Sequence, residues 1–303
     1  MFTERDYAAQ RPLIERAREK AQLWRLCLGL LVVAMTSYLL TATALPILGG
    51  LFPGQWLWDL PTGATPTAMF VLLGSFLFIT LGVALALRLL HQRQLKEILG
   101  PLPLAFWQFL RVSGALILLG LALLAVFVLF PVDLSGGRAE PLVQNMPIRL
   151  WLLLLLPALA AVLIQISAEE ILFRGYVQQT LAARFRSPLV WLILPSALFA
   201  IGHYVPADAG DNAALIALWA GLFGVLMADL TARAGSLGPA CAVHFFNNIL
   251  AMLIFGSPTN LSGLALYLLP YELSDTVAVR QMLWLDGAII LLGWLAARLA
   301  IRR

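Results

Sequence analysis

The chain alternates between long apolar runs and short polar stretches that contain Pro, Gly and charged residues. A helix needs roughly 20 apolar residues to cross the hydrocarbon core of a bilayer. The pattern predicts about eight transmembrane helices, at roughly 26–50, 68–90, 106–131, 150–167, 188–203, 213–230, 237–256 and 281–300. The expected fold is therefore an all-α, polytopic membrane helical bundle, with a single transmembrane domain over residues 26–303.

The first 25 residues are strongly charged and precede the first apolar run. Leu13, Ala17, Ala21 and Trp24 recur at helical spacing within this segment. We expect residues 1–25 to form a cytosolic amphipathic helix that lies on the membrane surface. A cleavable signal peptide is not expected, because the apolar run that follows exceeds the roughly 7–15 residues of a signal sequence.

Lys and Arg are distributed unevenly among the connections between the apolar runs. Of the 20 in the chain, 17 fall in the two terminal segments and in alternate connections. Cytosolic loops of membrane proteins carry an excess of Lys and Arg, so this distribution predicts that both termini are cytosolic.

The composition excludes several classes of protein. Hydrophobic residues make up 61% of the chain and charged residues 12%, against about 25% charged in a soluble domain. The net charge of +4 comes from segments that flank the spans, so it does not indicate a nucleic-acid partner. Cys27 and Cys241 lie within predicted spans and lack the spacing of a disulfide framework.

Three polar clusters interrupt the apolar sequence of the second half. An ionisable group in a span costs free energy and is a functional-site hypothesis by default. Two of the three histidines of the chain lie in these clusters, which are Glu169, Glu170 and Arg174, then Phe199 and His203, then His244 and Asn248.

The spacing of the first cluster predicts different roles for its two glutamates. Residues four apart share a helix face, so Glu170 is expected to pair with Arg174. Glu169 points about 100° away and is expected to face a cavity without a cation, as a general base. The helical stretch 168–186 is expected to break out of the membrane toward water, because of its polar start and its arginines.

The combined residues are those of a hydrolytic site. Glu169, helped by His203, could polarise and deprotonate a water molecule, and Phe199 could form a wall beside the imidazole. His244 and Asn248 share a helix face and could donate to a tetrahedral oxyanion. The Glu170–Arg174 pair would then hold the helix and orient Glu169. Each cluster alone is also typical of an ion pair or of hydrogen bonds between helices.

A metal site is the alternative chemistry. Glu169, His203 and His244 offer two histidines and one carboxylate, a ligand set found in catalytic zinc sites. The sequence lacks the HExxH pattern, and its two candidate histidines are about forty residues apart. A metal-free mechanism without a cofactor is therefore preferred, and zinc is left open.

The three clusters, in this order, resemble the EExxxR, FxxxH and HxxxN motifs of the CPBP family of intramembrane proteases, also called the Abi or type II CAAX prenyl protease family. The resemblance covers roughly residues 150–255. It implies a glutamate-dependent endopeptidase, often classed as a metalloprotease, whose site opens toward the cytosol and lipid. It also implies a membrane protein or lipidated peptide as substrate. The excess of Arg over Lys favours a GC-rich bacterial genome, and the expected location is the bacterial inner membrane.

Two other functions remain open. A non-proteolytic scaffold or binding protein, such as an immunity-type member of this family, would not need hydrolysis. A transporter would use Glu169 for proton coupling, but no internal repeat of the kind found in transporters is visible.

Overall fold

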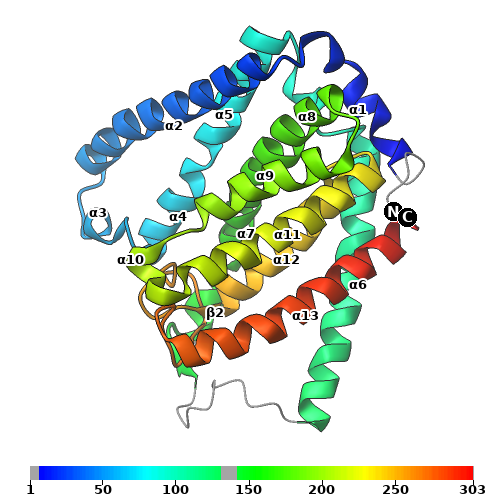
Figure 1. The fold of residues 1–303 in the computed structure, drawn as a ribbon. Helices are drawn as coiled ribbons and strands as arrows, with labels where there is room; N and C mark the ends of the chain where they lie inside the picture. Colours follow the sequence, from blue (N-terminus) through cyan, green and yellow to red (C-terminus); the bar gives the residue numbers. More distant parts are fainter. Residues whose placement is uncertain (1–6, 131–141, 303) are drawn as a thin grey trace.

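The computed structural model describes residues 7–130 and 142–302 of the chain. It confirms an all-α polytopic fold (Figure 1). The helices are α1 Arg11–Glu15, α2 Leu23–Leu51, α3 Trp56–Asp59, α4 Pro66–Ser75, α5 Leu77–Ala86, α6 Leu102–Leu129, α7 Ile148–Glu170, α8 Gln178–Arg184, α9 Pro188–Gly202, α10 Pro206–Ala209, α11 Ala213–Ala234, α12 Gly238–Ile249 and α13 Thr276–Ile301.

Each of the eight predicted apolar runs falls on a helix. In the described part of the chain, six helical stretches are long and apolar enough to cross a membrane: Leu23–Leu51, Pro66–His91, Leu102–Leu129, Ile148–Arg184, Pro206–Ala234 and Thr276–Ile301. The other two, Pro188–Gly202 and Gly238–Ile254, are apolar but shorter. The structure therefore supports an integral membrane protein, while the count of eight crossings stays a prediction.

Helices α7, α9, α11 and α12 form the centre of the bundle, with α2, α4 and α5 on one side and α6 and α13 on the other (Figure 1). Helix α12 packs against α6, α7 and α11. Its first residue, Gly238, lies so close to α6 that a Cβ there would overlap the carbonyl oxygen of Ala105. This glycine lets the helix that carries His244 and Asn248 reach the centre of the bundle.

The outward faces of the bundle are strongly apolar. Large aliphatic and aromatic side chains are exposed along α2, α6, α7 and α13, and Leu118 of α6 is 70% exposed. Patches of this extent are unusual on soluble monomers and mark contact with a membrane or a partner. Together with the length of the helices, they indicate surfaces that contact lipid.

The N-terminal segment differs from the single surface helix that the sequence predicts. It forms three short helical turns, Ala8–Gln10, Arg11–Glu15 and Arg18–Lys20. Leu13, Ala17 and Ala21 are buried, and the segment packs against α8 and α11. Three of the four predicted apolar positions therefore face protein rather than lipid, whereas Trp24 lies in α2 and is 56% exposed. The first six residues lie outside the described part of the chain.

A buried polar cluster fixes this segment to the bundle. The hydroxyl of Tyr7 donates to Asp229 Oδ1 at 2.8 Å, and Arg233 donates to the same carboxylate at 2.8 Å. Trp294 Nε1 of α13 donates to Asp229 Oδ2 at 3.1 Å. Burial raises the pKa of Tyr7 above its ordinary value, so the hydroxyl remains a donor. These bonds connect the N-terminal segment, α11 and α13.

A small sheet joins three loops, which the sequence does not predict. Strand β3 (Tyr267–Leu268) pairs antiparallel with β1 (Val143–Gln144) and parallel with β2 (Phe255–Gly256). Each strand has two residues, which is too short for an alternating pattern to be recognised. The first helical turns and the end of α13 lie at one end of the bundle, and this sheet lies toward the other (Figure 1).

Candidate active site

The two adjacent glutamates form the last turn of α7, where the helix widens. Residues Ile171–Val177 continue α7 as a π-helical segment, before α8 begins. Short π-helical segments inside α-helices are frequently found at functional sites. Glu170 is fully buried, whereas the Glu169 side chain is 14% exposed. The two carboxylates therefore have different access to solvent or substrate, as their spacing predicted.

Glu170 and Arg174 form the predicted ion pair, and both side chains are buried inside the protein. The Arg174 Nη1 to Glu170 Oε1 distance is 3.0 Å, and the Arg174 side chain is only 1% exposed. Its Nη2 donates to the Gly224 carbonyl at 3.3 Å, and its guanidinium lies 4.8 Å from the ring centroid of Phe199. The expectation that this part of 168–186 turns toward water is wrong for Arg174, because α9 and α11 cover it.

His244 contacts both glutamates. Its Nδ1 lies 2.8 Å from Glu170 Oε1, and its Nε2 lies 3.4 Å from Glu169 Oε2. Because a carboxylate accepts, Nδ1 carries a hydrogen in this contact. Glu169 therefore has the His244 imidazole as a neighbour, a contact that the sequence does not predict. The ring is also enclosed by Phe199 and Phe223, at centroid distances of 6.1 and 4.9 Å.

Asn248 lies one turn after His244 on the same buried face of α12. Its Nδ2 donates to Gln165 Oε1 at 2.8 Å, and its Oδ1 accepts from Asn247 Nδ2 at 3.1 Å. Gln165 is itself buried and lies one turn before Glu169 on α7. The amide of Asn248 is therefore held in a fixed orientation, and one of its two N–H groups remains available to a ligand.

His203 contacts Phe199, whose ring also lies beside His244. Its Nδ1 donates to the Phe199 carbonyl at 2.8 Å, and the two rings lie 4.3 Å apart. Phe199 is thus beside the imidazole, as the sequence predicts. With Nδ1 protonated, Nε2 of the neutral ring is an acceptor. His203 is half-buried at the end of α9, where Ile201 and Tyr204 are exposed, so the site reaches the protein surface there.

The alternative zinc site would require Glu169, His203 and His244 to lie close together. Among residues 7–130 and 142–302, no three His, Cys, Asp or Glu side chains are grouped closely enough to hold a metal ion. Both ring nitrogens of His244 face carboxylates, and Nδ1 of His203 is bonded to backbone.

The sequence reasoning missed Gln165 and Phe223. Gln165 is four residues before Glu169, so its position on the same helix face was a signal that could have been used. Phe223 stands in an apolar run among other aromatic residues, and nothing in the pattern distinguishes it. The packing of α11 against α12 alone brings it to His244.

Comparison with known proteins supports the motif reading. Residues 150–250 match the family described as type II CAAX prenyl endopeptidase Rce1-like, which confirms the family resemblance for this third of the chain. The chain is also similar to the uncharacterized protein YyaK of Bacillus subtilis (strain 168), with 28% identity over 196 residues. That alignment covers 62% of this chain and 61% of YyaK. No solved structure matches the chain.

Proposed function

We propose that this protein is an intramembrane endopeptidase that hydrolyses a peptide bond of a membrane protein or lipidated peptide. The observation that carries the proposal is the accessible Glu169 carboxylate beside His244, in a site built from buried polar groups among apolar helices. The family match of residues 150–250 supports the same reaction class. The proposed location is the inner membrane of a bacterium.

The reaction begins with a water molecule between Glu169 and the substrate carbonyl. Glu169 takes a proton from this water, and the acceptor Nε2 of His203 helps to orient it. The hydroxide forms a bond to the carbonyl carbon, and the carbonyl electron pair moves to oxygen. The resulting oxyanion is stabilised by the remaining N–H of Asn248 and by His244 when its Nε2 is protonated. Glu169 then returns the proton to the leaving amine as the C–N bond breaks.

The remaining residues hold these groups in position. The Glu170–Arg174 pair fixes the end of α7 and the Nδ1 side of His244. Gln165 fixes the amide of Asn248. Positioning of this kind matters because the reacting groups must lie within hydrogen-bond reach of the substrate.

The test compares protein termini in membranes from cells that express the wild-type chain or Glu169→Ala at matched levels. New N- and C-termini that require Glu169 would support the protease and identify its substrate. An identical set of termini, with a cellular phenotype that the variant retains, would contradict hydrolysis and favour a scaffold. Proton-coupled flux in sealed vesicles that depends on Glu169 would favour a transporter.

A further inference from the structure

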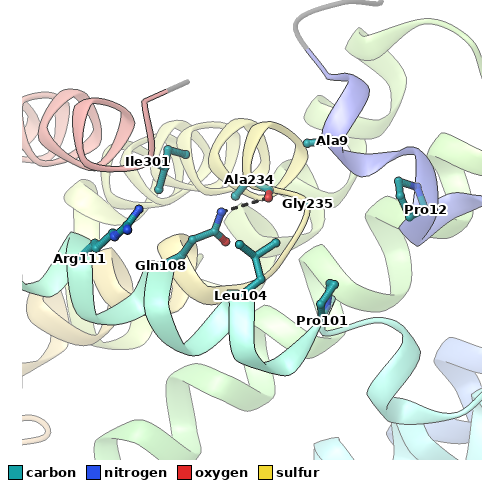
Figure 2. A pocket seen from close by; sticks show the side chains of 9 residues that line it. All are labelled: Ala9, Pro12, Pro101, Leu104, Gln108, Arg111, Ala234, Gly235 and Ile301. Atoms are coloured by element: carbon teal, nitrogen blue, oxygen red, sulfur yellow. Dashed lines mark hydrogen bonds between the residues drawn. The ribbon is translucent and has the colours of Figure 1, made fainter.

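A cavity of about 320 Å³ lies outside the candidate active site, where the N-terminal segment, the start of α6, the α11–α12 turn and the end of α13 meet. Figure 2 shows Gln108 and Arg111 together on α6, with Ala234, Gly235 and Ile301 opposite them. The lining residues are Ala9, Pro12, Pro101, Leu104, Gln108, Arg111, Ala234, Gly235 and Ile301.

The wall formed by the α11–α12 turn has a defined structure. Gly235 adopts a φ of 69°, and a Cβ there would overlap the carbonyl oxygen of Ala9. Gln108 Nε2 donates to the Ala234 carbonyl at 3.2 Å, and Gln108 Oε1 accepts from Ser236 Oγ at 2.5 Å. These contacts connect α6, the turn and the N-terminal segment around the cavity.

Among the described residues, Arg111 is the only ionisable one that lines this cavity, and none of the lining residues is a carboxylate. Within the described part of the chain its guanidinium makes no hydrogen bond or ion pair, and it lies beside the polar Gln108 (Figure 2). Arg11 directly precedes the lining residue Pro12, and Arg302 directly follows Ile301. Two further positively charged residues are therefore close to the cavity in the sequence. Guanidinium groups bind phosphate through paired N–H donors, which makes an anionic ligand the chemical match.

The rest of the cavity is apolar and adjoins the surface that faces lipid. Leu104 and Ile301 line it, and α6, α11 and α13 all belong to stretches long enough to cross a membrane. Leu118 lies seven residues after Arg111, on the same face of α6, and is strongly exposed. A ligand whose phosphate binds Arg111 could therefore extend an apolar chain along α6. Such a ligand is an amphiphile.

We propose that this cavity binds the headgroup of an anionic phospholipid, with Arg111 holding the phosphate and one acyl chain following α6 past Leu118. Basic pockets at the ends of transmembrane helices recognise anionic headgroups in this way. The bound lipid contacts the turn that leads into α12, the helix of His244 and Asn248. This site does not depend on the proposed protease activity, and its test measures binding alone.

The experiment uses the purified full chain in detergent and measures binding of phosphatidylglycerol by native mass spectrometry. Arg111→Gln removes the cation, and Leu104→Trp fills the cavity without changing charge. The control is Arg88→Gln, which removes an exposed arginine at the end of another apolar helix. We expect affinity to fall at least about tenfold in the first two variants and to change less than about twofold in the control.

Three results would overturn the proposal. Equal loss in Arg111→Gln and Arg88→Gln would indicate diffuse attraction rather than a site. Equal affinity for phosphatidylcholine would exclude recognition of an anionic headgroup. Competition by glycerol 3-phosphate at the concentration of the lipid itself would assign the site to a free phosphate compound. Thermal unfolding of each variant shows whether it is folded, and the charge-neutral Leu104→Trp remains informative if Arg111→Gln is not.

Discussion

Glu169 and Glu170 are adjacent, yet their surroundings differ at the scale of single side chains. Glu170 contacts Arg174 and His244 and is fully buried, while Glu169 lies near Nε2 of His244 and is partly accessible. The first arrangement suits a structural anchor and the second suits a group that exchanges a proton with substrate. The two residues should therefore respond differently to substitution.

Glu169→Gln should abolish most activity while the protein stays folded. The amide keeps the shape of the side chain but does not accept a proton from water, and general-base catalysis contributes about 10²–10⁴-fold. We expect at least about a hundredfold loss of cleavage of the substrate found by terminal mapping, with an unchanged thermal unfolding temperature. The control is Glu272→Gln, an exposed carboxylate on a loop. Full activity in a folded Glu169→Gln protein would rule out its role as base.

Arg174→Met should destabilise the protein. Removing one member of a buried ion pair leaves the other charge uncompensated, which costs about 3–5 kcal/mol in the free energy of unfolding. The unfolding temperature measured in detergent should be clearly lower than that of the wild-type protein. The double variant Arg174→Met with Glu170→Gln should lose less stability than Arg174→Met alone. An additive loss in the double variant would mean that the pair does not couple as its 3.0 Å contact implies.

The contact between residues on one helix could be predicted from the sequence, and the contacts between different helices could not. The Glu170–Arg174 pair follows from a spacing of four on one helix. The contacts of His244 with the glutamates, and of Asn248 with Gln165, join residues 74 or more positions apart. Those contacts depend on how α7 and α12 pack, and no spacing rule gives that information.

At the scale of elements, the apolar runs predicted the helices and missed the interruptions in them. Runs of about 20 apolar residues are a strong signal because lipid requires every backbone group to be bonded internally. The π-helical segment Ile171–Val177 has no such signal, because it contains no proline and its single glycine does not distinguish a π-helix from an α-helix. The N-terminal segment shows the same limit: three of its four periodic apolar positions are buried, but the surface that covers them is set by tertiary packing.

Gly238→Ala tests the close packing of α12 on α6. The added methyl group would overlap the Ala105 carbonyl, so α12 must shift, at a cost of about 1–3 kcal/mol. We expect a lower unfolding temperature and a lower rate of cleavage, because α12 carries His244 and Asn248. Gly120→Ala on α6 is the matched control, since a Cβ there meets no atom within 4 Å. If both variants behave like the wild type, the contact does not position α12.

At the scale of the whole molecule, the N-terminal helical turns and the C-terminal end of α13 lie at the same end of the bundle, which predicts an even number of crossings (Figure 1). The positive charge of the connections predicts that this end is cytosolic. In a background with Cys27→Ser and Cys241→Ala, we expect Gln55→Cys to react with a membrane-impermeant thiol reagent added outside intact cells. Gln94→Cys should react only after the membrane is opened. The reverse pattern would invert the orientation, and equal reactivity would contradict the crossing between them.

The most direct measurement of the central claim, hydrolysis by Glu169, follows oxygen from water into product. The purified chain, in lipid vesicles, is incubated in oxygen-18 water with membrane proteins from cells that lack it, and new C-terminal peptides are analysed by mass spectrometry. We expect new C-termini that carry one oxygen-18 atom with the wild-type chain and none with Glu169→Gln. New labelled termini that form equally with Glu169→Gln, or none with either protein, would contradict the proposed mechanism.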